Sequence, residues 1–317
     1  MPSHYYIGTD EAGYGPNLGP LVVCATFWES GTEREIETLY QPLEGIVSTT
    51  GGSAAVFIAD SKRVYRQTKP VGLERAVFVP ARTLAISPRY DYDLWRLLAP
   101  GAYEQQRELP WFGNSALRLP LHADPVEIEA SAIRLTRRFD ETDFRLKRIL
   151  ASAIFPARFN ALVEETGSKG ALLSNETMRL VTALTSEIGE GTMHVVCDKH
   201  GGRNRYRPLL EEHFAAFVEI HEESPARSLY RFGPDSRRFE FTFRTKAEAC
   251  LPVALASCVA KYLRELAMRR FNAFWRRHLP DLNPTAGYPQ DARRFLYDIK
   301  STADRLGLAQ SLFWRNR

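Results

Sequence analysis

The sequence predicts an α/β protein, because segments typical of strands alternate with segments typical of helices along its 317 residues. Short apolar runs that end in charged or turn-forming residues indicate buried strands. We expect such strands at 5–9, 21–28, 54–59, 75–80, 193–197 and 239–245. Apolar residues at helical spacing predict helices within 33–44, 126–166, 174–189 and 251–261, and a final helix after residue 291.

The composition is that of an ordinary globular protein, with 44% hydrophobic and 25% charged residues. No apolar run approaches the ~20 residues that a membrane-spanning helix needs, and the N-terminus lacks the regions of a signal peptide. The cysteines lie in apolar segments without metal-binding spacing, so we expect buried reduced thiols in a cytoplasmic protein that contacts no membrane. These cysteines are Cys24, Cys197, Cys250 and Cys258.

Positive charge is concentrated in the last part of the chain. Residues 261–317 hold 12 Lys and Arg against 5 Asp and Glu, whereas the rest holds 30 against 33. A basic segment beside a carboxylate site suggests a polyanionic partner, of which nucleic acid is the commonest. A solvated helix face rich in arginine would give the same composition.

Two adjacent carboxylates, Asp10 and Glu11, follow the first predicted strand, and a turn rich in glycine and proline leads from them into the second. We expect these two strands to pair antiparallel. Neighbouring carboxylates repel each other and lose hydration unless a cation shares them, and their hard oxygens suit Mg²⁺ or Mn²⁺. The glycines allow the backbone to approach a ligand closely. A plain acidic surface turn is the alternative.

Two further acidic residues follow predicted strands. Asp198 comes directly after the strand 193–197, and Glu248 comes shortly after the strand 239–245. Ligands gather outside the strand ends of an open sheet, so these carboxylates could meet Asp10 and Glu11. Glu248 also lies near the start of a helix, where a negative charge is favourable without any catalytic role.

Basic residues follow two of the predicted strands. The group after 54–59 could contact a phosphate chain, or it could be a capped helix start with solvated charges. Its members are Ser61, Lys62, Arg63 and Arg66. The loop 199–205 is basic and rich in glycine, and it could also hold a phosphate; His200 in this loop is either a proton donor or a plain loop residue.

Residues 85–125 interrupt the regular pattern with five prolines and no periodicity, so they predict an insertion or a partly ordered arm. Its aromatic residues could stack on bases or pack against the body of the protein. They include Trp95, Trp111 and Phe112.

The motif DEAGYGPNLGPLVV, which begins at Asp10, resembles the opening motif of the type 2 ribonucleases H (ribonucleases HII and HIII), DEAGRGPLAGPVV. Three weaker matches follow in the order of the family. Asp60-Ser61-Lys62 is similar to its DSK, and TKAEACLPVALASCVAKY to its segment ending in AASILAK. Thr285-Ala286-Gly287-Tyr288 is similar to its KGYGT. The resemblance spans most of the chain apart from 85–125 and the basic loop.

This resemblance implies a ribonuclease H-like fold, with a mixed five-stranded sheet flanked by helices and a C-terminal helical extension. It implies a catalytic domain at 1–260, with an insertion at about 85–125, and a basic helical extension at 261–317. The activity implied is endonucleolytic hydrolysis of RNA in RNA–DNA hybrids or other RNA-containing duplexes, dependent on Mg²⁺ or Mn²⁺. We expect the protein to act as a monomer.

Carried onto this chain, the family's catalytic and metal-binding carboxylates correspond to Asp10, Glu11, Asp198 and Glu248. Alignment on Ser257 to Lys261 displaces Glu248 by one residue. The resemblance implies a two-metal mechanism in which Asp10 bridges cations roughly 3.5–4 Å apart. The backbone of the glycine turn would read a ribose 2′-hydroxyl, Tyr288 would stack on a sugar or base, and lysines would hold phosphates. The substrate-binding residues are then Gly13, Tyr14, Gly15, Ser61, Lys62, Lys261 and Tyr288.

One departure from the family concerns Tyr14, which stands where the family has arginine and so removes a phosphate-binding charge. Two other functions remain open on the same fold. One is a non-catalytic nucleic-acid-binding protein, which would bind hybrids in a salt-dependent way without turnover. The other is a different metal-dependent nuclease, of the DNA junction or exonuclease type.

Overall fold

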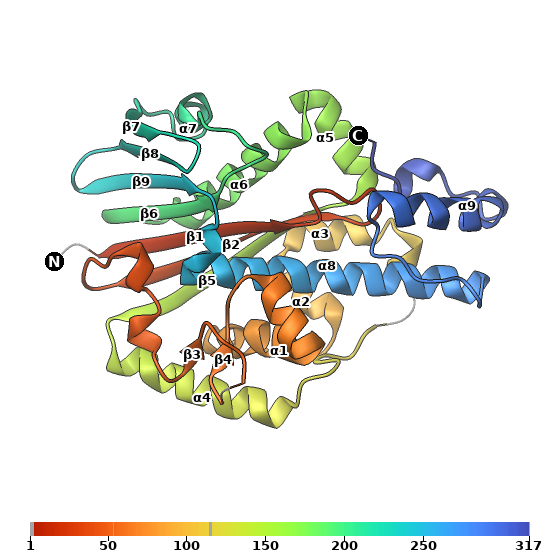
Figure 1. The fold of residues 1–317 in the computed structure, drawn as a ribbon, viewed down its shortest axis with the longest axis horizontal. Coiled ribbons are helices and arrows are strands. Elements are labelled where there is room, and N and C mark those ends of the chain that lie inside the picture. The colour runs from red at the N-terminus through yellow and green to blue at the C-terminus, as the bar shows by residue number, and fades with distance from the viewer. Residues whose placement is uncertain (1–2, 53, 114–115, 317) are drawn as a thin grey trace.

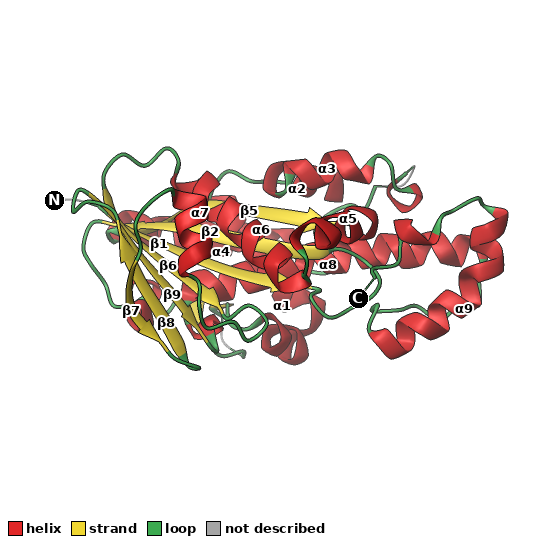
Figure 2. Ribbon diagram, turned by 90° about the horizontal axis from the view of Figure 1, so that it is seen from above, coloured by secondary structure: helices red, strands yellow, loops and turns green. Residues whose placement is uncertain are grey.

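The architecture was obtained as a computed structural model, which describes residues 3–52, 54–113 and 116–316. Outside the described residues lie positions 1–2 and 53 of the predicted catalytic domain, positions 114–115 of the predicted insertion and position 317 of the predicted extension. A twisted sheet runs through the protein with helices on both of its faces (Figures 1 and 2). The predicted fold class, a mixed α/β sheet flanked by helices, is confirmed.

The main sheet has seven strands in the order β5-β2-β1-β6-β9-β8-β7, where five were expected. The neighbours β1, β6 and β9 are parallel, and the remaining pairs are antiparallel, including the predicted pair β1–β2. The hairpin β7–β8 extends the sheet beyond β9. The strands are β1 (His4–Ala12), β2 (Leu21–Ser30), β5 (Phe144–Ile154), β6 (Gly191–Asp198), β7 (Glu219–Glu223), β8 (Arg227–Phe232) and β9 (Arg237–Arg244). Two short strands, β3 (Val47–Ser48) and β4 (Val56–Phe57), pair separately.

Each face of the sheet carries its own hydrophobic core, because successive strand residues point to opposite faces. Tyr6 and Cys24 face one core, whereas their neighbours Ile7 and Val23 face the other. The first core is covered by α1 (Ser61–Thr83), α2 (Asp91–Leu98), α3 (Pro100–Gln106), α4 (Pro125–Glu141) and α8 (Leu251–His278). The second is covered by α5 (Pro156–Thr166), α6 (Lys169–Thr185) and α7 (Arg207–Phe214). The last helix, α9 (Pro289–Arg305), packs beside the far end of α8 (Figure 1).

Helix α8 is the central helix of the fold and lies against β1 and β2. The close approach depends on Gly8 in β1, where an added Cβ would lie 2.2 Å from the backbone of Pro252 and Val253. The helix is longer than the predicted 251–261 and runs without interruption through residue 261, where the extension was expected to begin.

Four predictions of local structure are wrong. Residues 75–80 form part of helix α1 instead of a strand. Residues Ala76 to Ala81 are all buried, so their sequence is uniformly apolar, lacks helical periodicity and resembles that of a buried strand. Residues 144–154, expected to be helical, form β5, whose apolar residues are only partly alternating. Helix α6 begins before Ser174, because Ser168 caps it by accepting a hydrogen bond from the backbone of Ala171. The helix expected within 33–44 is present only as two short 3₁₀ turns, at Ile36–Thr38 and Gln41–Leu43.

The segment 85–125 packs against the body of the protein. Trp95 is fully buried, and Trp111 meets Phe271 of α8 edge to face with ring centroids 5.2 Å apart. Glu74 of α1 is also fully buried, and its carboxylate accepts hydrogen bonds from the backbone N–H groups of residues 121–123 and from the Tyr262 hydroxyl. The side chains of Trp95 and Trp111 thus pack against the body of the protein.

A buried ion pair joins the same segment to α8. The guanidinium of Arg270 donates to the carboxylate of Asp91 at 2.5 and 2.7 Å, with both side chains at most 5% exposed. The four cysteines are free and buried, as predicted. In the part of the chain that the structure describes, no helix combines the length and the apolar character needed to cross a membrane.

Candidate active site

The four predicted carboxylates lie at one edge of the sheet. Asp10 and Glu11 are close to the end of β1, and Asp198 is the last residue of the parallel neighbour β6. Glu248 lies in the 3₁₀ turn Ala247–Ala249, directly after β9, which is parallel to β6. Because parallel strands end on the same side of a sheet, the chain carries these acids to a common place, here called the carboxylate cluster.

Burial raises the pKa of every member of the cluster, and mutual repulsion adds to the rise at three of them. Burial raises the pKa of Asp10 well above its ordinary value, and the charge of Glu11 raises this pKa further. Burial, followed by the charges of Asp198 and Glu248, raises the pKa of Glu11 to about 7. Burial also raises the pKa of Asp198 and of Glu248, and the Asp198 charge adds to the rise at Glu248. The folded chain therefore holds more negative charge here than its own cations neutralise.

The positive charge of Lys62, in the first turn of α1, opposes this repulsion, since it lowers the pKa of Glu11, Asp198 and Glu248. The predicted cap at the start of this helix is present, with the Asp60 side chain accepting from the backbone of Arg63 at 2.8 Å. Ser61 is buried, and its hydroxyl lies 3.0 Å from that of Ser257 on α8. Ser257 in turn is hydrogen-bonded to Asp10, which lowers the pKa of Asp10.

The carboxylate cluster is open. All four carboxylates belong to the described residues, yet no three of them place one oxygen each within 4.8 Å of the others. In these side-chain conformations the four carboxylates therefore do not form a closed shell of metal ligands. The chemistry of the donors nevertheless fits a hard divalent cation, because every one is a carboxylate oxygen and their charges are incompletely balanced.

The glycine turn after β1 is held in one conformation. Gly13 has a φ of +89°, and a Cβ at this position would lie 2.6 Å from the Pro20 carbonyl oxygen and 2.9 Å from the Arg264 side chain. Gly15, by contrast, has open space around it. Gly13 therefore needs to be glycine for conformational reasons, whereas Gly15 does not.

Arg264 of α8 is the main support of this turn. Its guanidinium is buried and donates to the carbonyl oxygens of Pro20, Leu18 and Ala286. Burial lowers the pKa of Arg264 to about 10. Sequence reasoning missed this residue, because nothing in a helical arginine shows that it reaches backbone carbonyls more than 240 positions away.

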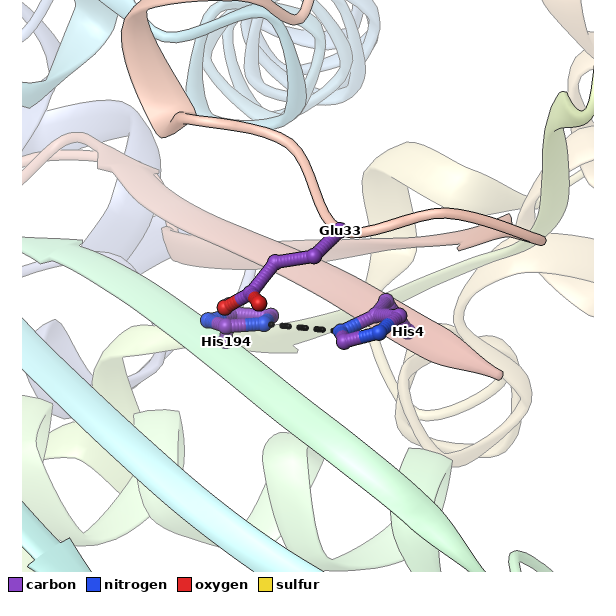
Figure 3. A group of neighbouring side chains, drawn as sticks. All are labelled: His4, Glu33 and His194. Atoms are coloured by element: carbon purple, nitrogen blue, oxygen red, sulfur yellow. Dashed lines mark hydrogen bonds between the residues drawn. The ribbon is translucent and has the colours of Figure 1, made fainter. Parts of the chain in front are cut away.

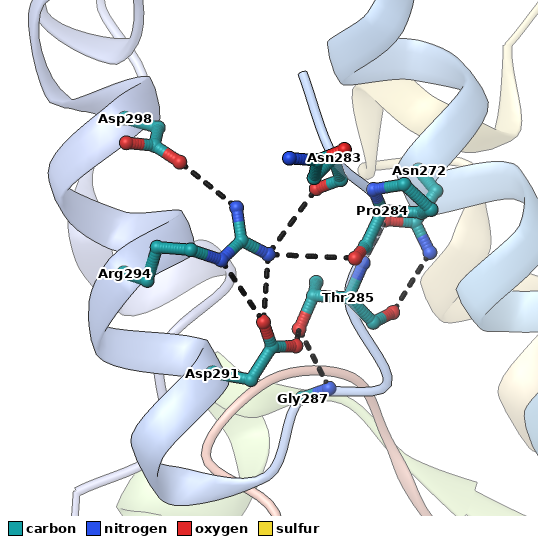
Figure 4. Close-up of polar contacts among 8 residues, drawn as sticks. All are labelled: Asn272, Asn283, Pro284, Thr285, Gly287, Asp291, Arg294 and Asp298. Atoms are coloured by element: carbon teal, nitrogen blue, oxygen red, sulfur yellow. Dashed lines mark hydrogen bonds and ion pairs between the residues drawn. The ribbon is translucent and has the colours of Figure 1, made fainter.

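A second loop and a C-terminal segment complete the support of the turn. The Gly287 carbonyl accepts from the backbone N–H groups of Asn17 and Leu18. Figure 4 shows the loop at 283–287 held by Asn272, Asp291 and Arg294. Arg315 is buried; its backbone N–H donates to the Asn17 carbonyl, and the Asn17 side chain donates to the Arg315 carbonyl.

Two predicted substrate-binding residues, Lys261 and Tyr288, line one cavity of about 240 Å³. Tyr288 is 55% exposed and directly precedes α9, next to the loop that holds the glycine turn. Lys261 is paired with Glu265, and its Nζ lies 5.5 Å from the centre of the Tyr65 ring. The cavity therefore offers an aromatic surface and an ammonium group close to each other.

Another hollow, of about 450 Å³, reaches Glu248 itself. Arg63 and Lys246 also line it, together with Asp60 and Tyr40. Lys246 was not among the predicted site residues. Its distinguishing feature is a left-handed backbone conformation with a φ of 58°, which cannot be recognised in the sequence.

Tyr14 lies between the start of α6 and the loop after β6. The Lys169 ammonium at the start of α6 lies 5.3 Å from the centre of the Tyr14 ring. An added Cβ on Gly201, in the loop after β6, would lie 3.2 Å from the Tyr14 hydroxyl. The aromatic ring thus fills the space between two elements that flank the carboxylate cluster.

The basic loop 199–205 makes mostly internal contacts. The Lys199 ammonium donates to the Ser224 carbonyl at 2.6 Å and to Asn204 at 2.7 Å. His200 is buried, with its Nδ1 3.1 Å from the Ser174 hydroxyl, and burial lowers its pKa to about 3. A histidine that stays neutral in the interior is a poor proton donor, which favours the structural reading of His200.

No protein-family profile and no curated protein matches the chain. Solved structures that align with it include ribonuclease HII of Archaeoglobus fulgidus, taken from its complex with PCNA, at 16% identity and a TM-score of 0.42, covering 98% of this chain and 94% of the other. Ribonuclease H2 of Pyrococcus horikoshii aligns at 16% identity and a TM-score of 0.41, with 98% and 92% covered. Ribonuclease H3 of Aquifex aeolicus aligns at 15% identity and a TM-score of 0.39, with 98% and 71% covered. Likeness at this level assigns neither family nor activity.

Proposed function

We propose that the protein is a metal-dependent endonuclease that hydrolyses RNA in RNA–DNA hybrids. The observation that carries the proposal is the gathering of Asp10, Glu11, Asp198 and Glu248 at the ends of neighbouring parallel strands, next to a rigid glycine turn. Carboxylates are expensive to bury together, and a phosphodiester-cleaving metal site is one function that requires it.

Asp10, Glu11, Asp198 and Glu248 would hold Mg²⁺ or Mn²⁺, since they offer only oxygen donors and excess negative charge. When bound, such a cation neutralises charge at the scissile phosphate and activates water for attack. The charge of Lys62 would remain available beside the cluster, where it draws the anionic substrate backbone towards the carboxylates and limits their repulsion in the free protein.

Substrate recognition would rest on the backbone of the glycine turn. Arg264 holds this turn rigidly from behind, so its exposed side can present N–H groups at fixed positions. A fixed donor can read the ribose 2′-hydroxyl, the group that distinguishes RNA from DNA. Tyr288, more than half exposed beside the turn, would stack on a sugar or base, and Lys261 would contact a phosphate.

Lys169 compensates in this proposal for the arginine that the family has at the position of Tyr14. The Tyr14 ring stands between the glycine turn and the first turn of α6, and Lys169 lies over that ring. A positive charge is therefore present next to the glycine turn, although a different element supplies it. Phosphate binding at this point would involve the helix start as well as the lysine.

The test is cleavage of a labelled RNA–DNA hybrid by the complete protein in the presence of Mn²⁺ or Mg²⁺. We expect hybrid cleavage that chelation abolishes and that Asp10→Asn lowers by at least about 100-fold, because one essential charge is removed. Asp235→Asn, at an exposed carboxylate that precedes β9 and so lies at the end of this strand opposite Glu248, is the matched control and should retain full activity.

A substrate panel separates the alternatives. Binding of the hybrid without cleavage would indicate a non-catalytic nucleic-acid-binding protein. Cleavage of branched or single-stranded DNA with an intact hybrid would indicate a different nuclease. Undiminished hybrid cleavage by Asp10→Asn would remove the carboxylate cluster from the mechanism.

A further inference from the structure

A second group of metal-ligating side chains lies at the other end of β1. His4 is the first residue of this strand, His194 belongs to β6, and Glu33 lies in the loop after β2. Each offers one ligand atom within 4.8 Å of the other two, and no comparable trio of His, Cys, Asp or Glu occurs elsewhere among the described residues. Figure 3 shows the Glu33 carboxylate over the His194 ring and the two imidazoles edge to edge. Asp10 lies six positions after His4, about 20 Å along the strand.

The two imidazoles direct ring nitrogens at each other. The Nε2 atom of His194 lies 3.5 Å from Nδ1 of His4. The other nitrogen of His194, Nδ1, lies 3.8 Å from the carboxylate of Glu240, its partner in the register of β9. A carboxylate on one side of the ring favours the N–H on Nδ1 and leaves the Nε2 lone pair for a ligand. This carboxylate–imidazole arrangement is common around metal ions.

The packing around His194 restricts its ring. Only 6% of the residue is exposed, and its ring stacks on that of Tyr6 with centroids 4.9 Å apart. Burial lowers the pKa of His194 to about 4, so the imidazole is neutral at physiological pH. A neutral imidazole is the form that binds metals.

The loop that carries Glu33 is tied to the same aromatic ring. The Tyr6 hydroxyl accepts from the backbone N–H of Arg34 at 2.6 Å and donates to the Arg34 carbonyl at 3.0 Å. The Arg34 guanidinium forms an ion pair with Asp143. Glu33 is therefore adjacent to an anchored residue, while its own side chain is exposed and can adjust to a ligand.

We propose that His4, Glu33 and His194 bind a divalent transition-metal ion of the zinc type. Two nitrogen donors and one carboxylate match the ligands of Zn²⁺ and disfavour Mg²⁺, which prefers oxygen alone. The negative charge of Glu33 complements the cation, whereas the Glu240 carboxylate is already ion-paired with Arg231 at 3.0 Å. The bound ion would connect β1, β6 and the loop after β2, and it would leave one coordination position for water.

The test is Zn²⁺ titration of the complete protein against a chromophoric chelator, with excess Mg²⁺ present to occupy the carboxylate cluster. We expect one Zn²⁺ per chain, and a loss of affinity of at least about tenfold in His4→Gln and in Glu33→Gln. Neither substitution removes a buried side chain, so the fold should persist. His221→Gln, at a histidine of β7 paired with Glu219, is the control and should bind Zn²⁺ normally.

Two further measurements test whether the bound Zn²⁺ is held by the two histidines and Glu33, separately from the carboxylate cluster. Asp10→Asn should bind Zn²⁺ like the native protein, which separates this site from the carboxylate cluster and from the proposed nuclease activity. Co²⁺ added in place of Zn²⁺ should give an absorption spectrum with nitrogen ligands, and this spectrum should disappear in His4→Gln. Unchanged Zn²⁺ affinity in both His4→Gln and Glu33→Gln would overturn the proposal and leave a plain hydrogen bond between the two histidines.

Discussion

Glu11 links the electrostatics of the cluster to the stability of the protein. Its pKa is about 7 in the folded chain against an ordinary value of 4.5, so the folded state binds an additional proton between these pH values. Without metal, Glu11 therefore contributes full stability below about pH 4.5 and loses it as the pH rises through 7. We expect Glu11→Gln to raise the free energy of unfolding at pH 8 by on the order of 2 kcal/mol, and to change it little at pH 4.

Urea unfolding in the presence of a chelator measures this effect. Glu165→Gln, at an exposed glutamate of α5, is the control and should leave the pH dependence of unfolding unchanged. Equal pH dependence in Glu11→Gln and the native protein would show that Glu11 ionises normally.

Gly13 and Gly15 form a matched pair within the same turn. An alanine at 13 would need a positive φ and would collide with the Pro20 carbonyl and Arg264, whereas an alanine at 15 meets nothing within 4 Å. We expect Gly13→Ala to lower the free energy of unfolding by about 1–3 kcal/mol and to reduce hybrid cleavage, whereas Gly15→Ala should change the free energy of unfolding little. Urea unfolding and cleavage rates measure both variants. Similar losses in the two would argue against the turn as a shaped recognition element.

At the scale of elements, the segment 85–125 is attached to α8 by the buried pair of Asp91 and Arg270. Asp91→Asn removes the carboxylate charge that compensates the buried guanidinium charge of Arg270, so we expect a loss of about 3–5 kcal/mol in the free energy of unfolding. Glu104→Gln breaks an exposed pair with Arg107 in the same segment and should cost at most about 0.5 kcal/mol. Denaturant titration compares the two. Equal small losses would mean that the segment contributes little to global stability.

Elements with a distinct boundary could be predicted from sequence, whereas the second half of α1 and strand β5 could not. The strands at 21–28, 193–197 and 239–245 end in turns or charges, and all three are present. The second half of α1 is buried on all sides, so its sequence lacks the polar face that marks a helix. Strand β5 was missed because it pairs with only one neighbour, β2, and carries several exposed charges.

On the scale of the whole molecule, the sheet order explains which parts of the site were predictable. Asp10 and Asp198 end parallel neighbours, so their proximity follows from the rule that ligands gather at strand ends. Arg264 and Lys169 come from helices whose contacts depend on the final packing, and short motifs contain no information about them. The pair of histidines at the opposite end was missed because 190 residues separate them.

The contact between Asn17 and Arg315 has a consequence for protein synthesis. These residues are 298 positions apart, and they exchange hydrogen bonds through the Asn17 carbonyl and side chain. While the chain is still being made, β1, β6 and β9 can already pair, but the glycine turn lacks this support until Arg315 has been made and has reached Asn17. A partly synthesised chain would thus bring its acids together before the glycine turn is supported, so the proposed nuclease activity would develop only after this last contact has formed.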